Sequence, residues 1–404
     1  MTDFFVRLLR RETASTEFIP ELDGLRFMSI IMILLYHINL IISEKSASLN
    51  FAGTQTDIAP VTNAFAVGFQ GVQLFFVISG FILAIPFMSY HFGLSERKLP
   101  LGKYFLRRLT RLEPPYILSL ILLFGLGLYA ARFDLLTGAK SLLLSIFYIH
   151  TLAVPGEFPL INNVTWSLEI EVQFYICAPF LVWLICRIRN KTPRRLMLVA
   201  AILAASAMAW YLQMQVGIKT WSLALYLQYF LSGVLLCDLY LLENRSSSRF
   251  NSWVFFVLGL GILLVIISFD HVASPNLALR ILSPLLIFCL YFLTFWNKWW
   301  SRIFSLNALT LIGGMCYTIY LLHYWIISAV SNRAVRIFYV ENYPVFLFVQ
   351  MVVMLAIVLA ISVVYFVFVE KPCMRKDWPN RLYRFVTNLD RGSRWNLEKQ
   401  RNKA

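Results

Sequence analysis

Charged residues are scarce in this chain. Asp, Glu, Lys and Arg make up 14% of its 404 residues, against about a quarter in a typical soluble domain. So few charges do not cover a surface that faces water on all sides. Because 59% of the residues are hydrophobic, a disordered or collagen-like chain is excluded as well. The composition predicts a membrane protein.

The six cysteines form no pattern that binds metal or builds a disulfide framework. Their spacing is irregular, and the sequence has no CxxC pair and no Cys/His cluster. We therefore expect no metal site and no bound cofactor. Residues 1–26 also lack an uninterrupted apolar segment followed by a small-residue cleavage site. The sequence thus predicts that no signal peptide is removed and that the first apolar run stays in the membrane.

Long apolar runs dominate the rest of the chain. A helix needs about 20 mostly apolar residues to cross a bilayer, and this predicts an all-α, polytopic transmembrane helix bundle of ten spans. An eleventh stretch, 141–154, contains His150 and is short enough to indicate a re-entrant or interfacial segment. The ten predicted spans are 27–43, 62–88, 114–131, 165–186, 196–215, 221–241, 252–269, 281–297, 305–328 and 344–369.

The basic residues predict the orientation of the bundle. They concentrate before the first span, in the segment 89–113 and in the C-terminal tail, and loops rich in Lys and Arg stay in the cytoplasm. We therefore predict cytoplasmic N- and C-termini, with a cytoplasmic segment 1–20, a transmembrane domain 21–372 and a basic tail 373–404. The net charge of +15 is then explained by a face near anionic lipids, and no nucleic acid is expected as a partner.

Two ionisable residues mark the first span. Arg26 stands at its cytoplasmic edge, and His37 follows eleven residues later, about 16 Å deeper along a helix. One interpretation of His37 is a hydrogen bond that joins two helices. The other is a proton-handling group, because membrane-embedded ionisable residues are functional candidates by default.

A basic cluster precedes the third span. Arg108 and Arg111 share one helix face, and Pro114 and Pro115 predict a break in the helix after them. Ordinary positive-inside anchoring explains many such clusters. The alternative is a phosphate-binding patch open to the cytosol, since guanidinium groups match phosphate oxygens.

The outer ends of two later spans carry further candidates. Glu171 lies near the start of the span 165–186, where it is either a wet carboxylate that favours the helix dipole or a group that binds or deprotonates a hydroxyl. Trp166 is typical of an interfacial anchor. Tyr320 and His323 share one face of the ninth span, and His323 there needs a hydrogen-bonding partner.

Six blocks of sequence, in order along nearly the whole chain, resemble the acyltransferase 3 family of integral membrane O-acyltransferases. The family's Arg-x10-His, RxxR and SGF motifs have counterparts here at Arg26 and His37, at Arg108 and Arg111, and at Ser79-Gly80-Phe81. The blocks are LDGLRFMSIIMILLYH (22–37), GVQLFFVISGFILA (71–84), YFLRRLTRLEPPY (104–116), WSLEIEVQFY (166–175), IGGMCYTIYLLH (312–323) and VEKP (369–372).

The resemblance implies a reaction. Family members take an acyl group, often acetyl, from cytoplasmic acyl-CoA and place it on a hydroxyl of a surface or lipid-linked glycan. It implies a multi-pass protein of the bacterial inner or plasma membrane, with acyl-CoA, such as acetyl-CoA, as co-substrate. A small-molecule or lipid acceptor, and a non-enzymatic transporter of a glycan or anion, stay open as alternatives.

The resemblance also implies roles for the candidate residues. His37 acts as a general base or briefly carries the acyl group, and Arg26 and Glu171 complete the catalytic set. The expected acyl-CoA-binding residues are Arg108, Arg111, Ser79, Gly80 and Phe81. The expected acceptor-binding residues are Trp166, Tyr320 and His323.

Overall fold

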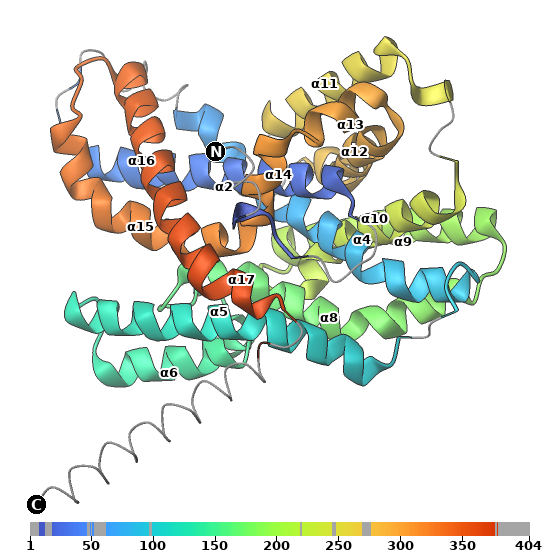
Figure 1. Ribbon diagram of the computed structural model, residues 1–404, viewed down its shortest axis with the longest axis horizontal. Coiled ribbons are helices and arrows are strands. Elements are labelled where there is room, and N and C mark those ends of the chain that lie inside the picture. The colour runs from blue at the N-terminus through green and yellow to red at the C-terminus, as the bar shows by residue number, and fades with distance from the viewer. Residues whose placement is uncertain are drawn as a thin grey trace, which may run out of the picture.

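The computed structural model describes residues 8–12, 18–46, 49, 51, 62–96, 99–218, 220–244, 248–268, 276–375 and 378. All regular elements in these ranges are helices, as the long apolar runs predicted, and they pack into one bundle (Figure 1). The long helices are α2 (Pro20–Ser46), α4 (Gly71–His91), α5 (Leu101–Tyr129), α8 (Trp166–Cys186), α9 (Lys191–Met214), α10 (Leu223–Leu242), α12 (Leu277–Trp296), α15 (Cys316–Ile337) and α16 (Tyr343–Tyr365). The shorter elements are η1 (Val67–Gln70), α6 (Leu135–Ile146), α7 (His150–Ala153), η2 (Asn163–Thr165), η3 (Ser248–Phe250), α11 (Trp253–Ser268), α13 (Lys298–Phe304), α14 (Asn307–Gly314), η4 (Phe366–Glu370) and α17 (Lys371–Cys373).

Eight helices of the described ranges are long and apolar enough to cross a membrane, where ten spans were predicted. The difference comes from two places. Helix α11 has 16 residues, which is short of the usual length for a crossing. Helices α14 and α15 would make one span together, but they are bent by 70° at the break between them.

Helix α11 nevertheless runs alongside α12 in the opposite direction. Tyr229, in the first half of α10, hydrogen-bonds Ser283, in the first half of α12 (3.1 Å), so α10 and α12 begin at the same end of the bundle. At the other end, the Asn297 amide donates to the carbonyls of Phe250 and Ser252, just before α11. Helix α11 therefore begins beside the end of α12 and leads the chain back to the end of the bundle where α12 begins.

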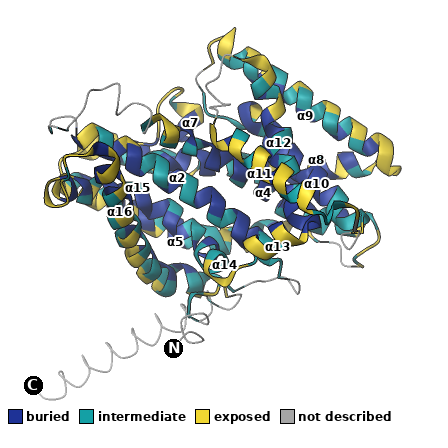
Figure 2. Ribbon diagram, turned by 90° about the horizontal axis from the view of Figure 1, so that it is seen from above, coloured by how far each residue is buried: buried dark blue, intermediate teal, exposed yellow. Residues whose placement is uncertain are grey.

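Large apolar side chains cover the outside of the bundle. Figure 2 shows α4 and α10 largely buried, whereas α9 and α16 present exposed faces. In water such a surface would aggregate, but hydrocarbon tails solvate it. Exposed examples from five helices are Ile121, Phe180, Leu196, Trp253 and Phe348.

The predicted break at the double proline is wrong. Helix α5 runs without interruption from Leu101 to Tyr129 through Pro114 and Pro115. Pro114 has no N–H to bond the Thr110 carbonyl, and the indole N–H of Trp378 donates to that oxygen instead (2.8 Å). In a membrane bundle, neighbouring side chains that satisfy freed backbone groups let a helix continue through proline.

The segment 141–154 does not form one helix. Helix α6 has twelve residues and ends at Ile146, and the chain then turns through Tyr148, which has a positive φ of 57°. Helix α7 follows with four residues. Neither helix has the length of a span, in agreement with the prediction for this segment.

The two ends of the described chain meet. The Lys371 ammonium donates to the Leu8 carbonyl (2.8 Å), and Arg375 forms an ion pair with Glu12 (2.9 Å). The N-terminal residues 8–12 and the end of the last long helix therefore lie on the same side of the bundle.

Candidate active site

A cavity of about 320 Å³ lies inside the bundle, between α2, α4, α5, α8, α14, α15 and residues 370–375. Its lining has a strong excess of positive charge. The charged residues that line it are Arg11, Arg26, Arg107, Arg108, Arg111, Arg375, Glu171 and Glu370. Six guanidinium groups face two carboxyl groups, which suits a ligand with several negative charges.

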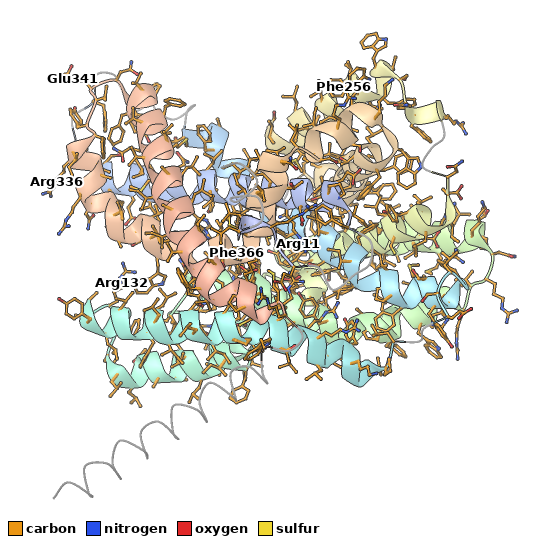
Figure 3. The ribbon with its side chains drawn as sticks, viewed as in Figure 1. Arg11, Arg132, Phe256, Arg336, Glu341 and Phe366 are labelled. Atoms are coloured by element: carbon orange, nitrogen blue, oxygen red, sulfur yellow. The ribbon has the colours of Figure 1, made fainter. Side chains whose placement is uncertain are left out.

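The cavity has a mouth and a deep end. Arg107 and Arg375 line it and are exposed, so it reaches the surface there. Along α2 and α15 the lining continues away from this mouth as far as Ile33 and Tyr320. Arg11 belongs to the wall near the mouth, and Figure 3 shows it near the middle of the molecule in this view, while Arg336 lies at the edge.

One buried carboxylate holds two of the arginines. Asp23, in the first turn of α2, is 1% exposed and accepts from Arg26 (2.5 Å) and from Arg11 (2.8 Å). Burial among apolar atoms, followed by the neighbouring charge of Arg26, lowers the pKa of the Arg11 guanidinium. Asp23 opposes this shift, so Asp23 keeps two like charges together at the cavity wall.

A close helix contact positions this pair. A Cβ atom on Gly313 would lie 1.8 Å from the Asp23 carbonyl oxygen, so only glycine allows α14 to approach α2 here. The bend after α14 then turns α15 along the cavity, where Cys316 and Tyr317 join the lining.

The two arginines of the RxxR motif both face the cavity. Arg108 lies over the ring of Tyr104 (4.0 Å to the centroid) and near that of Tyr175 (5.2 Å). Arg111 follows one turn later and also lines the cavity. Cation–π contacts of this kind fix the direction of a guanidinium group while its N–H donors stay available.

The SGF residues divide between two faces of α4. Ser79 lines the cavity, and its hydroxyl donates to Glu171, which joins α4 to α8. Gly80 packs against the backbone of Phe230, and Phe81 is buried against other aromatic rings. Gly80 and Phe81 are not among the lining residues, because successive helix positions turn by about 100°.

The two histidines of the motif blocks meet just beyond the deep end. His37 lies one turn after Ile33, and His323 lies one turn after Tyr320. Their ring nitrogens, His37 Nδ1 and His323 Nε2, are 3.1 Å apart. His323 is fully buried and His37 is half-buried. A region of two imidazoles therefore follows the arginine-lined cavity along the same two helices.

Tyr320 lines the deep end of the cavity, before the histidine pair, and Trp166 begins α8 next to the lining residue Ser167. Tyr320 hydrogen-bonds the Val164 carbonyl (2.5 Å) and the Ser167 hydroxyl (3.0 Å), and so closes the deep end of the cavity. Trp166 is buried and stacks on Phe69 (5.6 Å between centroids), so it does not occupy an exposed interfacial position. The binding roles of both residues stay predictions.

Sequence reasoning missed part of this site. Glu370 stands in the VEKP block with no predicted role, yet it lines the cavity and accepts from the backbone and hydroxyl of Thr318 (3.1 and 2.5 Å). It ends a π-helical turn, an irregularity common at functional sites. The cost of burying a carboxylate in an apolar run was a signal that could have found it.

Glu169, two residues before Glu171, has a structural role instead. It accepts from the backbone and hydroxyl of Thr151 (both 2.9 Å) and attaches α7 to α8. In the part of the chain that the structure describes, no group of three or more His, Cys, Asp or Glu side chains is placed to hold a metal ion.

Fold and cavity together define a multi-pass helical membrane protein with a basic internal pocket next to a histidine pair. The chain belongs to the acyltransferase 3 family, whose acyltransferase-domain model matches residues 19–366. The resemblance of the six motif blocks is thereby confirmed.

Similar proteins include two from Staphylococcus aureus. O-acetyltransferase OatA of strain NCTC 8325 is 22% identical over 385 residues, which cover 90% of this chain and 58% of that protein. Putative O-acetyltransferase SACOL0978 of strain COL is 24% identical over 337 residues, which cover 78% of this chain and 52% of that protein. The chain thus spans between half and three fifths of the length of these relatives. No solved structure matches it.

Proposed function

We propose that this protein is a membrane O-acyltransferase that moves an acetyl group from acetyl-CoA to a hydroxyl of a surface or lipid-linked polysaccharide. The observation that carries the proposal is the cavity rich in arginine whose deep end lies one helical turn from His37. The names of the two relatives, both O-acetyltransferases, support the acyl group.

The mouth of the cavity suits the phosphates of the donor. Arg107 and Arg108 neighbour each other there, Arg111 follows, and Arg375 lies two residues after α17. Phosphate oxygens accept pairs of hydrogen bonds from guanidinium forks. With the phosphates at this end, the pantetheine arm extends inward past Arg26, and the thioester approaches His37.

The imidazole of His37 then serves as the general base. It takes the proton from the acceptor hydroxyl while the hydroxyl oxygen attacks the thioester carbonyl. The C–S bond breaks, and the imidazolium returns the proton to the thiolate, so that free CoA leaves as a thiol. Arg26 lines the cavity about 16 Å before His37 along α2, and there its guanidinium positions the pantetheine arm.

The acceptor approaches from the opposite side of the membrane. We propose ten crossings, with both ends of the chain in the cytoplasm of a bacterium and the protein in its inner or plasma membrane. The antiparallel course of α11 beside α12 supports the count, and the contact between residues 8–12 and 371–375 supports an even number of crossings. The donor then enters from the cytoplasm.

The test uses sealed membrane vesicles with wild-type protein or His37→Ala, supplied with labelled acetyl-CoA. We expect label in the glycan or lipid-linked sugar fraction with wild type and a loss of about 1000-fold in the variant, because general bases contribute about 100- to 10,000-fold. His91→Ala is the matched control, since His91 is exposed at the end of α4 and outside the cavity.

Each other outcome has a definite meaning. Label that appears only in a small-molecule or lipid fraction assigns a different acceptor. Absence of transfer to any hydroxyl acceptor contradicts the proposal and favours a transporter. A labelled acyl-histidine trapped with acetyl-CoA alone replaces the general base by a covalent carrier.

A further inference from the structure

We propose that His323 is a positioning residue that determines which ring nitrogen of His37 carries the proton. The inference rests on the proposed function, in which His37 is the base. It follows from four hydrogen-bonding contacts that join the two imidazoles to each other and to the backbone.

The backbone contacts of His323 determine which of its ring nitrogens carries the proton. Its Nδ1 lies 3.0 Å from the Ile319 carbonyl oxygen and 2.8 Å from the Tyr320 carbonyl oxygen. Both oxygens only accept hydrogen bonds, so Nδ1 must carry the proton. A neutral imidazole has one N–H, and the Nε2 atom of His323 is therefore an acceptor.

The acceptor Nε2 of His323 in turn determines where His37 carries its proton. Its Nδ1 lies 3.1 Å from His323 Nε2 and 3.1 Å from the Ile33 carbonyl oxygen. Both neighbours are acceptors, so the proton of neutral His37 resides on Nδ1. The lone pair is then on Nε2, which makes no hydrogen bond to the residues that the structure describes. A base needs such a free lone pair.

Burial and ring contacts hold the two imidazoles in place. His323 is fully buried, and two backbone carbonyls of its own helix hold its ring. His37 also has edge-to-face contacts with Tyr36 and Tyr324 (4.9 and 5.4 Å between centroids). None of the ion pairs found among the described residues includes either histidine. A neutral imidazole thus takes the orienting position that a carboxylate often has beside a catalytic histidine.

The kinetic test compares His323→Leu with His323→Gln in proteoliposomes of the full-length protein. Leucine removes the acceptor. Glutamine places an amide oxygen close to the position of Nε2 and restores it. We expect kcat to fall about 100-fold in the leucine variant, with KM for acetyl-CoA within about twofold of wild type. The glutamine variant should recover most of the lost rate. Equal losses in both variants, or a change in KM alone, would overturn the proposal.

A second measurement does not depend on turnover. The ¹⁵N resonances of neutral histidine side chains distinguish protonated from unprotonated ring nitrogens, and the chain has only five histidines. In nanodiscs at mildly alkaline pH, the signals that disappear in His37→Asn belong to His37. We expect wild type and His323→Gln to show a protonated Nδ1 and an unprotonated Nε2, and His323→Leu to show the other tautomer or a mixture.

The two measurements separate the two proposals. If wild type transfers no acyl group but shows the expected tautomer of His37, the proposed function fails and the His323 inference stands. If His37 carries its proton on Nε2 in wild type, or keeps the same tautomer in the leucine variant, the inference fails whatever the activity.

Discussion

Arg107 and Arg108 are neighbours in the sequence and both line the cavity, but the structure holds them differently. Arg107 is exposed at the mouth. Arg108 is half-buried, with its guanidinium over one tyrosine ring and near a second. A pre-oriented guanidinium loses less side-chain entropy when it binds a phosphate. The two residues therefore form a matched pair for testing the donor site.

We expect Arg108→Ala to raise KM for acetyl-CoA about tenfold and to leave kcat nearly unchanged. Loss of a fixed phosphate contact removes about 1.4 kcal/mol of binding free energy, which corresponds to that factor. Arg107→Ala should change KM by about twofold or less, because its side chain is free to move in water. Steady-state kinetics over a range of acetyl-CoA concentrations measure both. Equal effects of the two substitutions would contradict a special role for Arg108.

Individual site residues were predicted from sequence when a polar group was costly at its position. Arg26, His37 and Glu171 were found in this way, and the structure gathers them around one cavity and its deep end. Asp23 and Arg11 were missed, because a charge near the end of an apolar run is ordinary in a membrane protein. Their importance depends on the ion pair between them, which no local pattern predicts.

At the scale of whole elements, a buried ion network joins α9 to α10. Asp238 is fully buried and accepts from Arg194 (2.5 Å) and Arg195 (2.7 Å), and Arg194 is itself 1% exposed. Arg195 continues to Glu243 (2.8 Å), just beyond the end of α10, and hydrogen bonds from Arg195 and then Lys191 lower the pKa of that carboxyl. The network therefore joins the beginning of α9 to the end of α10.

We expect Asp238→Ala to lower the free energy of unfolding by about 3–5 kcal/mol, because it leaves Arg194 as a buried charge without its partner. Lys191→Met is the control. Lys191 also pairs in this network, but 58% of its side chain is exposed, and such pairs contribute about 0–1 kcal/mol. Denaturant unfolding in one detergent compares the two. A loss in Asp238→Ala no larger than in Lys191→Met would contradict the assigned role.

The approximate positions of the long helices followed from hydropathy, but the course of the backbone at two places did not. The double proline in α5 was interpreted as a break, since the sequence does not show that Trp378 supplies the missing donor. The stretch 305–328 was predicted as one span, and the structure divides it at Met315. In both places a distant part of the chain decides the course of the backbone.

At the scale of the whole molecule, the direction of each crossing can be tested. Ten crossings with both ends in the cytoplasm place the residue before α11 inside and the start of α12 outside. In a variant without its own cysteines, a membrane-impermeant maleimide should label Leu277→Cys in spheroplasts. It should label Ser252→Cys only after the membrane is opened.

Glu341→Cys serves as the outside reference, because Glu341 is exposed between α15 and α16, at the edge of the molecule in Figure 3. Labelling of Ser252→Cys and Leu277→Cys from the same side would contradict a crossing by α11. Labelling of Ser252→Cys alone in spheroplasts would invert the whole arrangement, and the arginine-lined mouth would then face outward.

The sequence by itself determined that this is a membrane protein, that its fold is helical and which family it resembles. Hydropathy and the scarcity of charge depend only on which residues the chain contains and in what order. The motif blocks are likewise continuous stretches of sequence. Only the tertiary structure decided which of these stretches share a site. His37 and His323 lie 286 positions apart, yet their ring nitrogens are in contact, and Ser79 separates from Gly80 and Phe81 because the helix turns them to different neighbours. The physical reason is that a hydrogen bond or a cavity wall depends on distances in space, which close packing of many helices sets together.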